Sequence, residues 1–208
     1  SYKKWFRSSY CLSQNCSCVL RLLIIFFEGF MRILISALGL MVSSVGYAAD
    51  WTPVFKSLED GCTTNHAVFN SLSENLIQLK EVKDMTVVDV HPSAKKGNYA
   101  KTPQPYRNDM RPAIVRKLNV NEDFYKYNEV FIGLKNATAY GVPLLGFSEY
   151  TSGINGIYGH IIYFKTPNAQ QLKRLKKIKF TEDKDMGFKG EIVKAKNGQY
   201  LLVCDSST

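Results

Sequence analysis

The sequence predicts an α+β fold, in which N-terminal helices pack on an antiparallel sheet of about five to six strands and one basic helix comes late in the chain. Two observations support this prediction. Helical spacing of apolar residues occurs soon after residue 48 and again in one late basic segment, whereas the segments between are β-rich and separated by glycine, asparagine and serine turns. The chain is also 45% hydrophobic and 22% charged, which excludes intrinsic disorder and allows one buried core.

Residues 1–48 differ from the rest of the chain and are expected to be missing from the mature protein. Residues 31–48 follow the plan of a secretory signal peptide: one cationic residue, an apolar stretch too short to span a membrane, and small residues ending at Ala48. Residues 1–30 precede this leader and are interpreted as a non-native upstream extension. A true extended leader and a membrane anchor are the alternatives. The leader predicts a periplasmic or secreted protein in which residues 49–208 form a single, mildly basic domain.

Two cysteines remain in this domain, Cys62 near its start and Cys204 near its end. Exported proteins fold in an oxidising compartment, where an even number of cysteines normally pairs. We therefore expect a Cys62–Cys204 disulfide that ties the N-terminal helices to the last strand. No cofactor is expected, because a domain of this size buries enough surface to fold by itself.

The first elements of the domain are two predicted helices. Residues 50–58 have a proline in the first turn and apolar residues at helical spacing. After Gly61, either Thr63 or Thr64 is expected to cap a second helix, whose apolar pattern continues to Leu79.

The remainder of the domain is predicted to be mostly strands. A short strand at Met85–Val90 leads into a proline-rich loop over residues 91–112, and loops of this length are usually functional or mobile. A basic helix is expected over residues 169–179. Asn197-Gly198 predicts a tight hairpin turn between the last two strands. The other strands are expected at residues 129–134, 138–140, 142–150, 156–165, 190–195 and 200–204.

One segment resembles a known group of proteins. Residues 131–150, FIGLKNATAYGVPLLGFSEY, are followed by a strand that ends in Tyr163 and Phe164. This pattern is similar to a segment of small exported proteins of Gram-negative bacteria that have no assigned function. The resemblance covers about a fifth of the predicted domain. It implies export and strand structure, and it implies no chemistry.

Cys62 and His160 are the candidate catalytic residues. A thiolate beside an imidazole is the core of cysteine nucleophilic catalysis, and a position at a helix start would lower the pKa of the Cys62 thiol. The order of Cys62 and then Gly-His-Ile-Ile-Tyr at residues 159–163 resembles papain-like cell-wall amidases and endopeptidases of bacteria. The resemblance implies a cysteine-dependent hydrolase. A disulfide would consume the nucleophile, and no third, orienting residue is found, so the hydrolase is kept as the alternative to a protein that is not an enzyme.

Two weaker patterns concern metal ions and charged partners. Cys62 and His66 lie one helical turn apart, but no second pair accompanies them, so no metal site is expected. The basic patch of the late helix consists of Lys173, Arg174, Lys176 and Lys177. A solvated helix face, an acidic protein or weak contact with an anionic membrane surface would explain it, whereas export argues against nucleic acid as a partner.

The glycine-rich hairpin tip at residues 150–159 is the candidate binding loop. Its tyrosines supply large contact areas at low entropic cost. The order Ser-Gly, Tyr, Gly is distantly similar to the inhibitory loop of periplasmic lysozyme inhibitors, which implies binding to another protein. A hairpin with ordinary core aromatics is the alternative. The candidate contact residues are Tyr150, Ser152, Asn155, Tyr158 and His160.

Taken together, these observations favour an exported, non-enzymatic module that binds another protein in the cell envelope. A basic chain suits basic animal lysozymes poorly as targets. A toxin that attacks the envelope is a better match, so we expect an inhibitor or an immunity protein.

Overall fold

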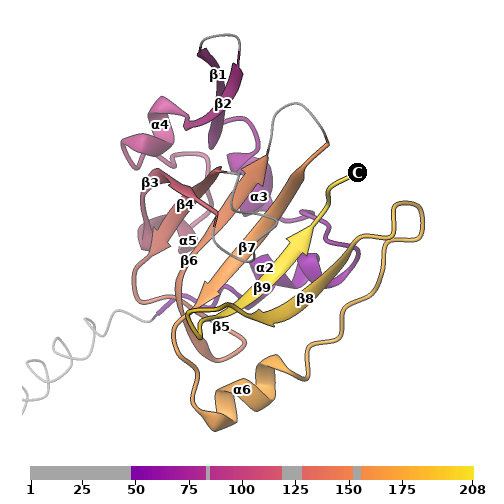
Figure 1. The fold of residues 1–208 in the computed structure, drawn as a ribbon. Coiled ribbons are helices and arrows are strands. Elements are labelled where there is room, and N and C mark those ends of the chain that lie inside the picture. The colour runs from indigo at the N-terminus through magenta and orange to yellow at the C-terminus, as the bar shows by residue number, and fades with distance from the viewer. Residues whose placement is uncertain (1–47, 83–84, 119–127, 152–155) are drawn as a thin grey trace, which may run out of the picture. The chain divides into compact units, whose positions relative to one another are not determined.

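The computed structural model describes residues 48–82, 85–118, 128–151 and 156–208, and these form the predicted α+β fold. Residues 47–208 make up one compact unit, in which an antiparallel sheet of seven strands is accompanied by short helices (Figure 1). None of the helices in the described residues is long and apolar enough to cross a membrane. The predicted upstream extension and the signal peptide before Ala48 lie outside the described residues.

The large sheet has the order β3-β4-β6-β7-β9-β8, and the short β5 pairs with β6. Its strands are β3 (Met110–Lys117), β4 (Asn128–Leu134), β5 (Thr138–Ala139), β6 (Val142–Thr151), β7 (Tyr158–Phe164), β8 (Lys189–Lys194) and β9 (Tyr200–Asp205). All neighbours in this sheet are antiparallel, including β7 and β9, which are separated in the chain by α6 and β8. Two further strands, β1 (Ile77–Val82) and β2 (Met85–Val90), form a separate hairpin.

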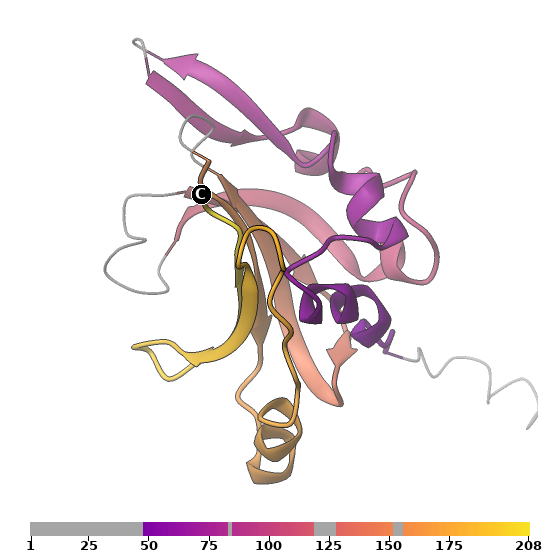
Figure 2. The same ribbon diagram turned by 90° about the vertical axis from the view of Figure 1, so that its right-hand side faces the viewer.

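The helices are short, and several of them cover one face of the sheet. They are α2 (Thr52–Phe55), the 3₁₀ helix η2 (Lys56–Glu59), α3 (Ala67–Leu72), α4 (Pro92–Lys95), α5 (Tyr106–Asp109) and α6 (Ala169–Leu175). Figure 2 shows α2 and α3 on the same side of the curved sheet. On this side the ring of Phe147 in β6 meets Trp51, Phe55 and Phe69 at centroid distances of 5.5, 5.8 and 6.3 Å. These aromatic contacts form the centre of the main core.

The other face of the sheet carries a smaller apolar cluster. It consists of Leu118, Tyr150, Ile161, Tyr163, Ala195, Leu201 and Val203. Successive residues of a strand point to opposite faces, so the same strands supply both clusters. In β7, Ile162 belongs to the main core and Ile161 to the smaller cluster.

The second predicted helix is much shorter than its apolar pattern indicates. Helix α3 ends at Leu72, and the residues from Ile77 onward form β1. β1 pairs with β2 through six consecutive residue pairs, so tertiary pairing overrides the helical spacing of this segment. The predicted caps are also wrong, because Nδ1 of His66 accepts the hydrogen bond from the backbone N–H of Val68 at 3.1 Å.

The predicted loop over residues 91–112 contains two short helices, α4 and α5, and the first residues of strand β3. The segment around this strand contains Pro112 and several charged residues, so its sequence does not show the pattern typical of a strand. Proline is tolerated here because β3 is an edge strand, and its pairing with β4 shifts register between Met110 and Ala113. Helix α6 is four residues shorter than the predicted basic helix.

Candidate functional site

Cys62 and Cys204 are joined in a disulfide, in agreement with the sequence prediction, and their Cα atoms are 5.4 Å apart. The bond connects the segment after η2 to the last strand, β9. Cys62 does not begin a helix, since α3 starts at Ala67, five residues beyond it, with His66 as its cap. The predicted effect of a helix dipole on the Cys62 thiol therefore does not apply.

His160 lies next to the disulfide, inside the protein. It is the register partner of Cys204 on the neighbouring strand, and only 2% of its surface is exposed. Its Nε2 atom is 3.2 Å from the hydroxyl of Tyr158 and 3.8 Å from Oε2 of Glu149, while the ring of Phe69 packs edge-on against the imidazole. Burial lowers the pKa of His160 to about 4 and raises the pKa of Glu149 to about 7, because it disfavours the charged form of each.

This buried cluster contains the carboxylate that sequence reasoning did not find beside His160. Glu149 and His160 face each other across β6 and β7. Nevertheless, the Cys62 sulfur is bonded to Cys204, and both Cys62 and His160 are buried. In the disulfide form the pair offers neither a free thiolate nor an exposed base to a substrate.

The structure does not assemble the candidate binding loop as a contact surface. Tyr150 and His160 are buried, Tyr150 in the smaller cluster and His160 beside Phe69 of the main core, so neither side chain is available to a partner. Tyr158 is half-buried against His160. Ser152 and Asn155 lie outside the described residues.

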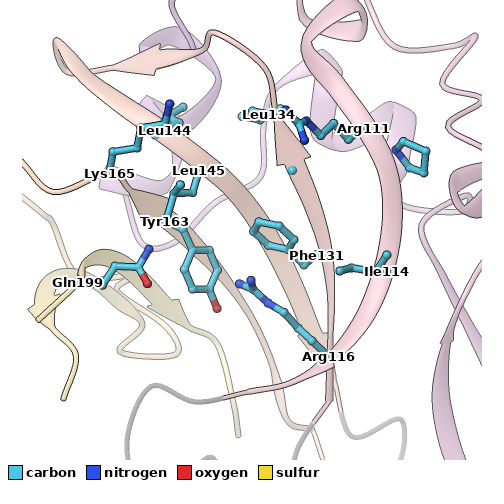
Figure 3. A pocket seen from close by; sticks show the side chains of 12 residues that line it. Arg111, Ile114, Arg116, Phe131, Leu134, Leu144, Leu145, Tyr163, Lys165 and Gln199 are labelled. Atoms are coloured by element: carbon cyan, nitrogen blue, oxygen red, sulfur yellow. The ribbon is translucent and has the colours of Figure 1, made fainter. Parts of the chain in front are cut away.

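A groove opens instead on the sheet face opposite α2 and α3 (Figure 3). We call it the sheet groove, and its volume is about 590 Å³. It is lined by Arg111, Pro112, Ile114, Arg116, Phe131, Gly133, Leu134, Leu144, Leu145, Tyr163, Lys165 and Gln199. Of these residues, three are cationic and none is acidic.

Two irregularities of the sheet lie along this groove. One is the register shift in β3, which spans Arg111 and Pro112. The other is a shift in the pairing of β6 with β7, which leaves Leu145 without a register partner and 43% exposed. Bulges of this kind bend a strand and redirect its side chains. They open the sheet face and place Arg111 and Leu145 on the rim of the groove.

Gly146 makes room for the floor of the groove. A Cβ atom at this position would lie 2.2 Å from the carbonyl oxygen of Ile132 and 2.5 Å from the ring of Phe131. Real side chains do not approach so closely, so glycine is required here. Because Gly146 has no side chain, the Phe131 ring can extend from β4 towards Tyr163. The centroids of the Phe131 and Tyr163 rings are 5.5 Å apart.

Arg116 is held in a fixed position at this floor. Its guanidinium carbon lies 3.6 Å from the centroid of the Phe131 ring and 4.3 Å from that of Tyr163, as the close-up in Figure 3 illustrates. Its Nε atom donates a hydrogen bond to Oε1 of Glu129, which is buried beneath the groove. Ser148 donates to the other carboxylate oxygen, and the Tyr163 hydroxyl donates to the same oxygen at 2.5 Å. Burial raises the pKa of Tyr163, so its hydroxyl remains a donor.

The charge that remains at the groove is positive. Glu129 compensates Arg116, whereas Arg111 and Lys165 are exposed and come from different strands, with Lys165 directly after β7. Ile114, 54% exposed, adds an apolar surface beside them. Such a combination suits an anionic group that carries an apolar or aromatic neighbour.

Sequence reasoning missed this site because its residues are distant in the chain. One signal was present: Ile114 and Arg116 alternate on β3 and face Phe131 and Glu129 on β4, a pattern of period two. The expected strands after the loop began only at residue 129, so this alternation on β3 was not used. Lys165 and Leu145 join the groove only through the pairing of β6 with β7.

The predicted basic patch lies elsewhere. Lys173 and Arg174 occupy the last turn of α6, Lys176 and Lys177 follow it, and all four are exposed. In the described ranges, no three His, Cys, Asp or Glu side chains gather closely enough to hold a metal ion.

The chain matches no family model, no curated protein and no solved structure. The resemblances noted in the sequence thus remain expectations. The sheet groove and the buried Cys–His–Glu cluster are the features on which a function can be based.

Proposed function

We propose that this protein is an exported, non-enzymatic binding protein whose sheet groove receives an anionic group of a partner protein in the cell envelope. The observation that carries the proposal is the composition of the groove. Three cationic side chains and two aromatic rings surround about 590 Å³, and no acidic residue is among its described lining.

The position of Arg116 favours binding. Its guanidinium is already fixed by Glu129 and by the rings of Phe131 and Tyr163, so little side-chain entropy remains to be lost when an anion binds. Its Nε atom bonds Glu129, and a guanidinium group carries four further N–H donors on its terminal nitrogens. Carboxylate groups match such a planar donor well.

The rim of the groove favours a peptide over a simple inorganic anion. Ile114 and Leu145 are exposed apolar residues on different strands, and they flank the cations. An aspartate or glutamate with an apolar neighbour would satisfy both kinds of contact. The groove alone is too small for a complete interface, so the partner would also contact the surrounding sheet.

Export and the partner's identity are parts of the same proposal. The signal-peptide pattern and the Cys62–Cys204 disulfide are both typical of an oxidising compartment. In that compartment, an acidic toxin that attacks the envelope is the partner we propose, and the protein would act as its inhibitor or immunity protein.

A displayed library of random peptides provides a direct test. The wild-type domain is expected to enrich sequences in which Asp or Glu neighbours an aromatic residue or leucine. The Arg111→Glu/Lys165→Glu variant should lose the peptides in which a single acidic residue stands beside an aromatic residue or leucine, because it reverses the charge of both exposed cations of the groove. Lys96→Glu/Lys184→Glu is the matched control, since it changes the net charge equally at exposed positions outside the groove. Equal loss in both variants, or no acidic enrichment by the wild type, would refute the proposal.

The cysteine hydrolase stays as a second candidate because of one observation, the proximity of Glu149, His160 and the Cys62–Cys204 bond. Breaking the disulfide would release a thiol next to an imidazole and a carboxylate. The burial of His160 argues against this function, since a substrate could not reach the base. The Cys204→Ser variant leaves Cys62 as a free thiol, and we expect it to release no fragments from purified cell-wall peptides. Cleavage that disappears in a Cys204→Ser/His160→Gln variant would favour the hydrolase.

A further inference from the structure

A second groove runs along the outer edge of β8, at the far end of the sheet from β3. We call it the edge groove, and its volume is about 680 Å³. Its apolar floor consists of residues such as Ile178, Phe180, Ile192 and Tyr200, and its cationic residues are Lys176, Lys189 and Lys194. In Figure 1 the segment between α6 and β8 returns along the outer side of β8.

The backbone of β8 presents unpaired groups to this groove. The N–H of Ala195 donates to the carbonyl of Gln199 at 2.8 Å, so these two form a hydrogen-bonded pair at the turn. In an antiparallel ladder such pairs alternate with pairs that do not bond each other. Counting back along the register, the N–H and C=O groups of Gly190, Ile192 and Lys194 point away from β9. Within the described part of the chain, β8 pairs with β9 and with no other strand.

The two edges of the sheet differ in how well they could accept another strand. On β3, Pro112 removes a donor and the register shift distorts the ladder, and both features block strand addition. β8 contains no proline and pairs in regular register over all six residues. β8 is therefore the edge that retains the geometry for another strand.

The wall opposite β8 is firmly packed. Phe180 lies so close to Gly190 that a Cβ atom there would be 2.7 Å from its ring. Ile178, Phe180 and Ile192 are half-buried and pack against the main core. A strand in the groove would find apolar side chains on the face that looks towards the helices.

We propose that the edge groove is a docking site for an extended acidic segment of a partner protein, which adds to β8 as a further strand. This contact goes beyond the sheet groove and does not involve its residues. The matching segment alternates acidic and apolar residues. Its apolar side chains cover Ile178 and Phe180 on the face of Ile192, its carboxylates point to the opposite face beside Lys189, and its backbone bonds the outward groups of β8.

Charge selects this occupant over a second copy of the same chain. Among the described residues that line the groove, three are lysines and one, Glu191, is acidic. Pairing of two β8 edges would bring the lysines of both copies together, and like charges on neighbouring strands are destabilising. Lysines on an edge strand also disfavour pairing with neutral or basic strands, so an acidic segment is the expected partner of β8.

A synthetic peptide of alternating Glu and Val is the probe for this site. In the complete mature domain, amide hydrogen exchange of Gly190, Ile192 and Lys194 should slow on peptide binding. The affinity should fall when the salt concentration rises. Absence of binding, protection at β3 or in the sheet groove, or protection without peptide through a β8–β8 dimer would each overturn the proposal.

A pair of variants isolates the backbone contact. Ile192→Pro and Ile192→Ala both remove most of the side chain, but only proline removes the outward N–H, which β9 does not use. We expect Ile192→Pro to bind the peptide about tenfold more weakly than Ile192→Ala. Equal affinities would refute strand addition. Arg111→Glu/Lys165→Glu should leave the affinity for this peptide unchanged, so failure of this site and failure of the sheet groove are distinguishable.

Discussion

Glu129 is the residue on which the floor of the sheet groove depends. It is 1% exposed and accepts hydrogen bonds from Arg116, Ser148 and Tyr163, which come from three different strands. A buried carboxylate is tolerated only when such partners compensate the loss of hydration. Its role is to position Arg116, and any contact with a ligand would be made by Arg116 itself.

The first prediction concerns this carboxylate. Glu129→Gln keeps the shape of the side chain but removes the charge that Arg116 requires, and we expect it to lower the free energy of unfolding by about 1–3 kcal/mol. Urea unfolding at neutral pH measures the change. Glu191→Gln, at an exposed position, is the control and should stay within about 0.5 kcal/mol of the wild type. Equal midpoints for both variants would show that Glu129 does not stabilise the floor.

The second prediction concerns Glu149 and pH. Burial raises its pKa from 4.5 to about 7, so between these values the unfolded chain has lost a proton that the folded chain keeps. The stability contributed by Glu149 is therefore present below about pH 4.5 and lost as the pH rises through about 7. Glu149→Gln is always neutral, so its stability relative to the wild type should rise by roughly 3 kcal/mol between pH 4.5 and 8.

His160 also contributes a pH dependence to the stability of both proteins. Burial lowers the pKa of His160 to about 4, so the stability that His160 contributes is present above 6.5 and lost as the pH falls through about 4. Both proteins contain His160, so the effect of its burial is common to both, and His160 changes the difference only through its contact with residue 149. Denaturant unfolding of the two proteins across this pH range gives the result. A difference that does not change with pH would mean that Glu149 is hydrated in the folded protein.

At the scale of single elements, β6 is the strand that forms the groove. Its bulge exposes Leu145, and Gly146 admits the Phe131 ring. Gly146→Ala would force Cβ against backbone and ring, and we expect a loss of more than about 3 kcal/mol, or failure to fold. Gly198→Ala is the comparison, since a Cβ there meets nothing within 4 Å and only its φ of +84° is unfavourable. It should cost about 1 kcal/mol by thermal unfolding, and equal costs would contradict the assigned role of Gly146.

Elements with a consistent local pattern could be predicted from the sequence. The strands from residue 128 to the end have β-rich segments and clear turns, and the Asn197-Gly198 hairpin joins β8 to β9 as expected. β1 could not be predicted, because Ile77 and Leu79 also fit a helical pattern and only pairing with β2 decides between the two. The sheet groove was missed for a related reason. The groove is lined by residues from separate segments, among them Arg111, Leu145 and Lys165. They lie close together because of strand pairing and its register shifts, and no local sequence pattern encodes such shifts.

At the scale of the whole molecule, the disulfide connects the N-terminal helices to the last strand across 142 positions. A bond that closes so long a loop stabilises the folded protein by about 4–5 kcal/mol in the chain-entropy model. We expect the Cys62→Ser/Cys204→Ser variant to have a free energy of unfolding that is lower by about this amount, and urea unfolding measures the difference. If the variant remains folded, it should still enrich acidic peptides, because the sheet groove contains neither cysteine. Unchanged stability would indicate that the bond is dispensable for the fold.

Site-specific photo-cross-linking in the cells that produce the protein tests the central claim most directly. A photo-reactive phenylalanine derivative replaces Leu145 on the rim of the sheet groove, and a second protein carries it at Met186, which is 55% exposed and outside the groove. We predict a cross-link from position 145 to an acidic envelope protein. This adduct should disappear with Arg111→Glu/Lys165→Glu and be missing at position 186. No adduct at 145, or the same adduct at both positions, would contradict a binding function of the sheet groove.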